Sequence, residues 1–283
     1  PRPAFDTQLG IENACSQCHQ DKSVDWLQAK TDAWYGEIKP HKAIVRTVLQ
    51  PGRFRNRIQA AQALLDSTVS HPLAQTEALV HFIKNFLQPD MPALEPEIVE
   101  LLKKIASNDD LDLQALALMA LHLSLGHHGE IRQFLQETLQ KIGKSELAVR
   151  KRWAIAVDFL GFLYSQQGDY RKAITAHRKA LQILPDEPVA LVNLGLAYGN
   201  SGDLDKAILA LQKAAAVEST YTLALKNLSI AYSQKGEIEQ AIAALQTAID
   251  IKPVDADAHV LLAQAYARAG RNFEALTVLQ AAQ

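Results

Sequence analysis

Residues 188–217, PVALVNLGLAYGNSGDLDKAILALQKAAAV, contain two short patterns of apolar and small side chains on either side of a glycine. Within each half these side chains recur at the three- and four-residue spacing of one helix face. They are Leu191, Leu194, Ala197 and Tyr198 in the first half, and Ala207, Leu211 and Ala214 in the second. Gly202 supplies the left-handed conformation that ends a helix and turns the chain. The stretch therefore predicts two closely packed helices joined at Gly202.

The same pattern recurs at intervals of 34 residues through the C-terminal half of the chain. The positions in register are Leu160, Leu194, Leu228 and Leu262; Tyr164, Tyr198, Tyr232 and Tyr266; Gly168, Gly202, Gly236 and Gly270; Ala173, Ala207, Ala241 and Ala275; and Ala180, Ala214, Ala248 and Ala282. Pro185 and Pro253 stand where a second helix must stop before the next copy begins. We therefore predict a repeat domain over 151–283, with copies at 154–187, 188–221, 222–255 and 256–283.

These residues resemble the tetratricopeptide repeat, whose 34-residue pattern has Leu-Gly, Tyr, Gly, Ala, Ala and Pro at the same offsets. The resemblance covers residues 154–283 and implies helix pairs stacked as a right-handed superhelix, an α-solenoid. Ser219 replaces the proline of the second copy, and Ser229 and Ala263 replace the glycine of the first helix. The fourth copy reads GRNFEA, with its aromatic residue one place late, so we expect less regular packing there.

Residues 41–150 also have helical patterns, but without a fixed repeat length. Amphipathic or apolar stretches such as PEIVELLKKIA and LDLQALALMALHLSL alternate with segments rich in Gly, Pro, Asn and Asp. The stretch SNDDLDLQALALMAL resembles the turn and second helix of a HEAT repeat. No strand series is recognisable, so the predicted fold class is all-α, with a HEAT-like region before the tetratricopeptide repeats.

Composition excludes several classes of function. The 283 residues have a formal net charge of −2 and 6% aromatic side chains, which argues against nucleic acid as a partner. No apolar run approaches the roughly 20 residues that span a bilayer, and no signal peptide is visible. Nucleotide-binding glycine loops, Gly-x-Ser-x-Gly elbows and His-Glu-x-x-His helices are also absent from the sequence. We predict no catalytic residues in this chain.

The two cysteines of the chain, Cys15 and Cys18, are followed directly by His19. CxxCH is the attachment signature of c-type haem: the two thiols form thioethers with the vinyl groups, and the adjacent imidazole is the proximal iron ligand. A redox pair, a structural disulfide and a partial zinc site are the alternatives, although no βαβ unit and no second cysteine pair accompany the motif. We therefore predict a c-type haem-binding segment over residues 1–40.

The run IENACSQCHQDKSVDWLQAKTDAWYG, residues 11–36, resembles the last haem-binding segment of a group of secreted bacterial multihaem c-type cytochromes. In that group the segment leads into HEAT-like helices and then tetratricopeptide repeats, the order predicted here. The resemblance implies an exported protein, periplasmic or extracellular, with further haem motifs upstream, so we expect this chain to be a fragment. Trp26 and Trp34 are candidates for packing on the porphyrin, with ordinary core burial as the alternative. Whether the full-length protein is a multihaem reductase is left open.

The second axial ligand of the iron is predicted to be a histidine. Met91 and Met119 are the only methionines and lie far along the chain, whereas His41 follows the haem segment closely. His41 is therefore the candidate distal ligand, and a solvated loop histidine is the alternative.

Tetratricopeptide arrays bind partners on the face lined by their first helices, and register predicts which residues lie there. They are Asp158, Phe162, Val192, Leu196, Lys226, Ile230, Val260 and Gln264, a largely apolar set suited to a peptide or protein. Two functions remain. The first is an electron-transfer module with one covalent haem and a docking scaffold, whose redox partners are upstream haem domains or other proteins. The second is a non-redox tetratricopeptide scaffold in which Cys15 and Cys18 form a disulfide.

Overall fold

The computed structural model describes residues 19–35, 54, 56–65 and 72–281, and in these ranges it contains helices and no strand. The predicted all-α class is confirmed for this part of the chain. The chain divides into two units, Pro1–Phe86 with Glu95–Leu101 and Leu87–Leu94 with Leu102–Gln283. The division falls within helix α7 (Pro96–Ala106).

The described helices of the first unit are α3 (Val24–Tyr35), α5 (Arg57–Leu65) and α6 (Pro72–Phe86). Helices α5 and α6 contact each other, and both have apolar side chains that are almost fully buried, among them Leu64 and Phe82. Arg57 donates from Nε and Nη2 to the two carboxylate oxygens of Glu95, at 2.9 and 3.0 Å. This bidentate pair lowers the pKa of Glu95 and holds the start of α7 against α5.

In the second unit, the end of α7 is followed by α8 (Leu111–Leu125), α9 (Gly129–Ile142), a short 3₁₀ turn η1 (Gly143–Ser145) and α10 (Glu146–Gln166). Helix α8 is apolar on all sides and almost wholly buried, as expected of a helix surrounded by others. Asp110 caps it by accepting from the backbone N–H groups of Asp112 and Leu113 at 2.9 and 3.0 Å. The HEAT-like classification of residues 41–150 stays a prediction.

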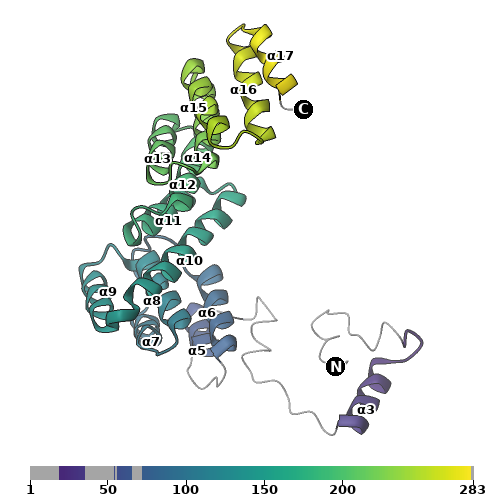
Figure 1. The fold of residues 1–283 in the computed structure, drawn as a ribbon. Coiled ribbons are helices and arrows are strands. Elements are labelled where there is room, and N and C mark those ends of the chain that lie inside the picture. Colours follow the sequence, from purple (N-terminus) through teal and green to yellow (C-terminus); the bar gives the residue numbers. More distant parts are fainter. Residues whose placement is uncertain (1–18, 36–53, 55, 66–71, 282–283) are drawn as a thin grey trace. The chain divides into compact units, whose positions relative to one another are not determined.

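The repeat region consists of four antiparallel helix pairs, and consecutive pairs contact each other (Figure 1). The first helices are α10, α12 (Pro188–Asn200), α14 (Thr222–Lys235) and α16 (Ala256–Arg268), and the second helices are α11 (Tyr170–Ile183), α13 (Leu204–Val217), α15 (Ile238–Ile251) and α17 (Asn272–Ala281). Helix α10 starts at Glu146, before residue 151 where we placed the beginning of the repeat domain. In the fourth pair, Phe273 of the shifted aromatic position is exposed rather than packed.

The turn chemistry follows the sequence pattern. The glycine between the two helices of each pair has a positive φ, for example 77° at Gly168 and 88° at Gly202. The next residue, Asp169 or Asp203, caps the second helix by accepting from the backbone N–H three positions on. A larger side chain at these glycines would be strained, so the 34-residue glycine spacing fixes where the chain reverses. The predicted glycine positions in the turns are confirmed.

Small residues set the distance between the helices of a pair. A Cβ atom placed on Gly195 would lie 2.6 Å from Leu211 Cγ, so only hydrogen fits where α12 crosses α13. Ala207, at the same crossing, is 1% exposed and belongs to the core cluster that also contains Leu191 and Leu211. The close approach of the two helices, which the small residues predicted, is therefore present where α12 crosses α13.

Replacing Ala207 with Leu is expected to lower the free energy of unfolding by about 1–3 kcal/mol, because added carbon atoms overpack a filled core. Ala216→Leu on the same helix is the control: its side chain is exposed, and the change should stay within about 0.5 kcal/mol. Urea unfolding followed by circular dichroism compares the two variants. Equal midpoints would show that the α12–α13 crossing tolerates a larger side chain.

Candidate functional site

The first helices of the repeats form a continuous surface. Helix α10 contacts α12, α12 contacts α14, and α14 contacts α16, so residues at equal register lie in rows. Phe162, Leu196 and Ile230 make one such row, and each is about two-fifths exposed despite being apolar. Gln264 continues the row in the fourth copy and is exposed as well. Val260 adds a further exposed apolar side chain on α16.

A second apolar row was not predicted from the sequence. Ile155, Val189 and Leu223 precede the first row by seven residues in each helix and are 65%, 48% and 43% exposed. Seven residues make almost two full helical turns, so both rows lie on the same side of their helices. The signal was available, because these residues also recur every 34 positions. The first-helix face is defined here as Ile155, Phe162, Val189, Leu196, Leu223, Ile230, Val260 and Gln264.

Val192 does not belong to this face, contrary to the prediction from register. It is 2% exposed and packs in the core cluster with Leu191, Ala224 and Leu228. Its position lies at the contact between consecutive first helices, so a small apolar side chain there is covered by the neighbouring helix.

Asp158, at the same register position as Val192, is engaged by neighbouring side chains. His177 Nδ1 of α11 lies 2.6 Å from Asp158 Oδ1, and Asn193 Nδ2 of α12 donates to Oδ2 at 2.8 Å. His177 is 1% exposed. Because an ionised carboxylate only accepts hydrogen bonds, His177 Nδ1 carries the proton and donates a hydrogen bond to an ionised Asp158. Asp158 therefore joins three helices and offers little to a partner.

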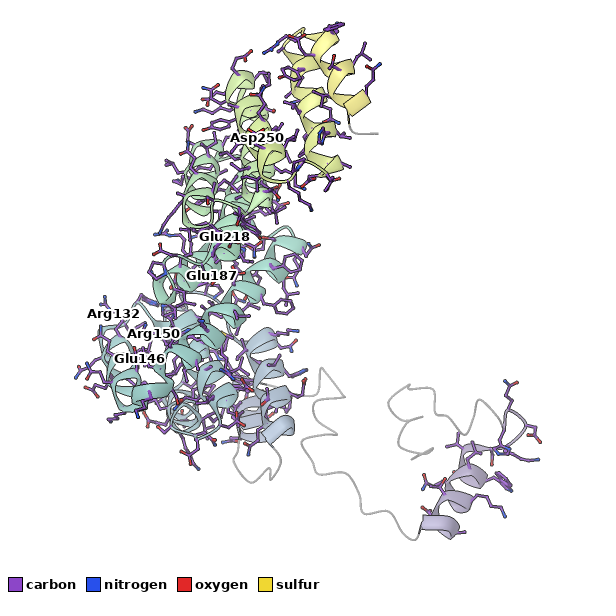
Figure 2. The ribbon with its side chains drawn as sticks, viewed as in Figure 1. Arg132, Glu146, Arg150, Glu187, Glu218 and Asp250 are labelled. Carbon is purple, nitrogen blue, oxygen red and sulfur yellow. The ribbon has the colours of Figure 1, made fainter. Side chains whose placement is uncertain are left out.

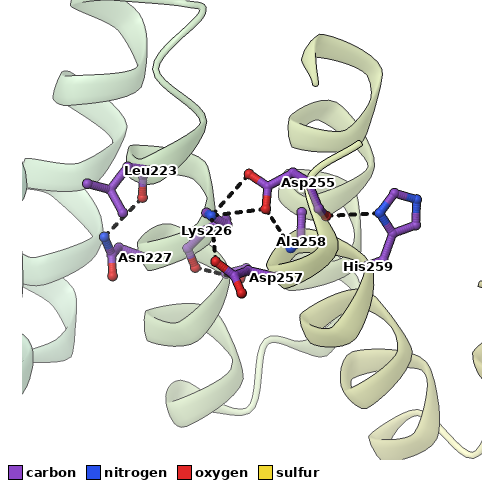
Figure 3. A network of polar contacts seen from close by, with 8 residues as sticks. Leu223, Lys226, Asn227, Asp255, Asp257, Ala258 and His259 are labelled. Atoms are coloured by element: carbon purple, nitrogen blue, oxygen red, sulfur yellow. Dashed lines mark hydrogen bonds and ion pairs between the residues drawn. The ribbon is translucent and has the colours of Figure 1, made fainter. Parts of the chain in front are cut away.

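Lys226 occupies the same register position in the third copy and forms ion pairs within the repeat region (Figure 3). Its Nζ lies 3.0 Å from Asp255 Oδ2 and 3.4 Å from Asp257 Oδ2, both on the α16 side of the interface. Asp255 is 6% exposed and also caps α16 by accepting from the backbone N–H of Ala258 at 3.1 Å. The predicted groove cation is therefore a link between the third and fourth copies.

The electrostatics of this pair favour the ionised forms in spite of burial. Burial lowers the pKa of Lys226, but hydrogen bonds and charges from Asp255 and Asp257 outweigh it and raise the pKa above its ordinary value. Burial raises the pKa of Asp255, but Lys226 and the Ala258 N–H lower it by a larger amount, so the pKa lies below its ordinary value. The first-helix face consequently presents apolar side chains with its central charges already paired.

The predicted haem ligands are divided between described and undescribed residues. Cys15, Cys18 and His41 lie outside the described residues, and for Trp34 only the backbone in α3 is described. His19 is exposed just before α3, and its ring centroid lies 5.9 Å from that of Trp26, which is 39% exposed. The imidazole nitrogens of His19 make no hydrogen bond within the described part of the chain. His19 is therefore an exposed imidazole beside a partly exposed indole.

The described residues also contain His122, His127 and His128 near the start of the repeat region. His127 Nδ1 lies 3.6 Å from Asp90 Oδ1, and His128 precedes α9. Across residues 19–35, 54, 56–65 and 72–281, no group of three His, Cys, Asp or Glu side chains could hold a metal ion. Nor does any helix in those ranges have the length and apolar character to cross a membrane.

The surroundings of His122 shift its pKa strongly downward. Burial, assisted by the positive charge of Lys179, lowers its pKa from 6.5 to about 4, with Gln182 and Asp90 opposing the shift. The folded protein therefore binds fewer protons than the unfolded chain between these two values. This contribution to stability is present above pH 6.5 and lost as the pH falls to about 4.

We expect the free energy of unfolding to fall by about 3 kcal/mol from His122 alone as the pH drops from 6.5 to 4. His122→Phe keeps an aromatic ring beside Trp153, whose ring lies 5.2 Å away, and removes the titration. Urea unfolding at several pH values should give a shallower profile for the variant. Identical profiles for both proteins across this window would contradict the assignment.

Comparison with known proteins supports the repeat architecture. Residues 153–218 match a family model described as the tetratricopeptide repeat, and residues 230–270 match a second, described as the TPR repeat. The chain carries tetratricopeptide repeats. These two matches cover the whole first copy and part of each of the other three. A search of curated proteins finds no significant match.

Several solved structures are similar to part of this chain. A crystal structure of MamA is 26% identical, with 54% of this chain and 87% of that chain covered and a TM-score of 0.44. MamA residues 41 to the end from Desulfovibrio magneticus RS-1 are 21% identical, with 53% and 90% covered and a TM-score of 0.42. The first TPR domain of Spaghetti (RPAP3), bound to an HSP90 peptide, is 23% identical, with 41% and 93% covered and a TM-score of 0.40.

Proposed function

We propose that this chain is the electron-transfer module of an exported multihaem c-type cytochrome, with one covalent haem and a tetratricopeptide docking scaffold. The observation that carries the proposal is the CxxCH motif, in which Cys15 and Cys18 would hold the porphyrin and His19 the iron. When bound, the haem supplies reversible one-electron exchange at its iron. Its location would be the periplasm or the cell exterior.

The surroundings of His19 fit such a group. The imidazole is exposed and free of hydrogen bonds to described residues, which a ligand nitrogen requires. Trp26, in the first turn of α3, is partly exposed and adjacent, so a flat apolar macrocycle would cover its indole. Lys22 and Lys30 lie 5.8 and 5.5 Å from the Trp26 ring, and their charges suit anionic propionates nearby. Trp34 is proposed as a second packing residue.

The scaffold part of the proposal rests on the first-helix face. Repeat arrays of this kind present extended surfaces for binding other proteins. Here two rows of exposed apolar side chains run along three first helices, and Asp158 and Lys226 between them are engaged internally. An apolar helix or extended peptide of a redox partner, or of the upstream haem domains, would bury these rows.

Expression in a host with c-type maturation machinery in an oxidising compartment tests the function. We expect a red protein with a sharp α-band on reduction and a mass increased by one haem after denaturation. A haem-free protein recovered from such a host would overturn the redox function. It would favour the alternative, a non-redox scaffold in which Cys15 and Cys18 form a disulfide.

The distal ligand gives a second, finer prediction. We propose bis-histidine coordination by His19 and His41, which gives a lower potential than histidine with methionine. His41→Ala should convert a low-spin spectrum into a high-spin one that binds added imidazole. His81→Ala, a histidine of α6, is the matched control and should leave the spectrum unchanged. A low-spin spectrum in His41→Ala would exclude His41 as the ligand.

A further inference from the structure

A cavity of about 590 Å³ lies in the second unit where α8, α9, α10 and α11 meet. Its size falls in the range of small-molecule sites, which is roughly 300–1,000 Å³. Leu135 and Leu139 of α9 and Ile183 of α11 provide apolar walls, and Trp153 of α10 contributes a buried indole. The cavity is separate from the first-helix face, with which it shares no residue.

Positive charge dominates the lining of this cavity. Four cationic side chains line it, against the single carboxylate of Asp90: they are Arg132, Arg150, Arg178 and Lys179. Asp90 is already engaged, since its Oδ1 lies 2.8 Å from Lys179 Nζ. Figure 2 shows Arg132 and Arg150 on the same side of the unit, with Glu146 beside Arg150. Glu146 accepts from Arg150 Nε at 2.8 Å.

Two guanidinium groups remain without a counter-charge. Neither Arg132 nor Arg178 makes a side-chain hydrogen bond or ion pair with any described residue, and both are exposed at the cavity rim. Like charges gathered around one hollow repel each other, and an anion bound there lowers this repulsion. Guanidinium groups bind carboxylate and phosphate oxygens with paired, charge-assisted hydrogen bonds.

Two of the lining side chains also have buried polar atoms without partners among the described residues. They are Trp153 Nε1, a donor, and His122 Nδ1. His122 Nε2 lies 3.0 Å from Gln182 Oε1, an acceptor, so Nε2 carries the proton and Nδ1 is left as an acceptor. Unsatisfied buried atoms are rare and each requires an explanation. Because these two atoms belong to side chains that line a cavity, a bound ligand, or water held by that ligand, would supply their missing hydrogen-bond partners.

We propose that this cavity binds a small organic anion that carries a phosphate or carboxylate group on an apolar body. The anionic group pairs with Arg132 and Arg178, and the apolar body packs on Leu135, Leu139 and Ile183. Asp90 and Lys179 form a neutral pair at the wall and do not compete for the ligand. The proposal is independent of the haem-binding segment.

Isothermal titration calorimetry on the full chain tests the proposal with three probes of similar size: phenyl phosphate, phthalate and neutral benzyl alcohol. We expect one anion or both to bind at one site per chain, more weakly as sodium chloride is raised, and benzyl alcohol not to bind. The tighter of phenyl phosphate and phthalate identifies the anionic group. Quenching of Trp153 fluorescence, absent in Trp153→Phe, places the probe in this cavity.

Arg132→Gln and Arg178→Gln should each weaken binding about tenfold, because each removes one charge-assisted contact. Arg171→Gln is the matched control: it lies on the same helix as Arg178, is exposed, and does not line the cavity. Both tested arginines are exposed, so the variants should keep wild-type circular dichroism. Wild-type affinity in both variants, or anions that bind no better than benzyl alcohol, would overturn the proposal. So would binding of an acidic peptide alone.

Discussion

Replacing both Cys15 and Cys18 with Ala is expected to abolish retention of haem through denaturation, the largest effect predicted for this protein. Thioether bonds survive urea, acid and organic extraction, whereas a coordinate bond from His19 to haem iron would not. In the double variant a haem could be held only by coordination and packing, and both are lost on unfolding. Mass spectrometry of the denatured chain and haem-stained gels measure the difference.

The controls separate haem loss from misfolding. Ser16→Ala changes a residue between the two cysteines without removing a thiol, and it should retain one haem per chain. Circular dichroism of the double variant should keep the helical signal, because the repeats bury their own core in the second unit. Covalent haem in the double variant would exclude these cysteines as the anchors. A helical, haem-free wild-type protein would instead support the disulfide alternative.

The repeat architecture was predictable because its determinants are local and periodic. Gly168 and Gly202 adopt the positive φ that their 34-residue spacing implied. Helices α11 and α15 end at Ile183 and Ile251, two residues before Pro185 and Pro253. Each of these signals acts within a few residues of the position it controls, so one sequence suffices to find it.

The first-helix face was predictable only in part. Register predicts which side of a helix a residue lies on, but not which neighbouring residues cover its side chain. Phe162, Leu196 and Ile230 are exposed as expected, but Val192 is covered by the next first helix. Lys226 is paired with Asp255, which lies 29 residues further on and caps α16, the first helix of the next copy. Contacts between consecutive copies depend on side chains that differ in type from one copy to the next. The helical period alone does not reveal these contacts.

The cavity where α8, α9, α10 and α11 meet could not be predicted from the sequence, for a related reason. Its lining extends from Asp90 to Ile183 and combines the irregular helical region with the first repeat. Arg132, Arg150 and Arg178 share no spacing or motif, so nothing in the sequence indicates that they converge. By contrast, the CxxCH motif is recognisable at once, since it consists of five consecutive residues.

Lys226→Met is expected to lower the free energy of unfolding of the fourth copy by about 3 kcal/mol. The methionine fills a similar volume but leaves the Asp255 carboxylate, which is 6% exposed, with the Ala258 N–H as its one hydrogen-bond donor among the described residues. Because copies in a repeat array are stabilised by their neighbours, the loss should be concentrated in α16 and α17. Hydrogen exchange of their backbone amides, with urea unfolding for the whole chain, measures it.

Lys235→Met gives the matched comparison on the same helix. Lys235 Nζ lies 2.8 Å from Asp205 and 2.7 Å from Glu237, but these partners are solvated, so removal of the charge should cost less than about 1 kcal/mol. Asn at position 255 keeps a good helix cap without a charge. The double variant Lys226→Met/Asp255→Asn should therefore recover much of the stability lost in Lys226→Met. Equal destabilisation by the two lysine variants would show that water reaches Asp255 and that its pairing with Lys226 does not hold the fourth copy in place.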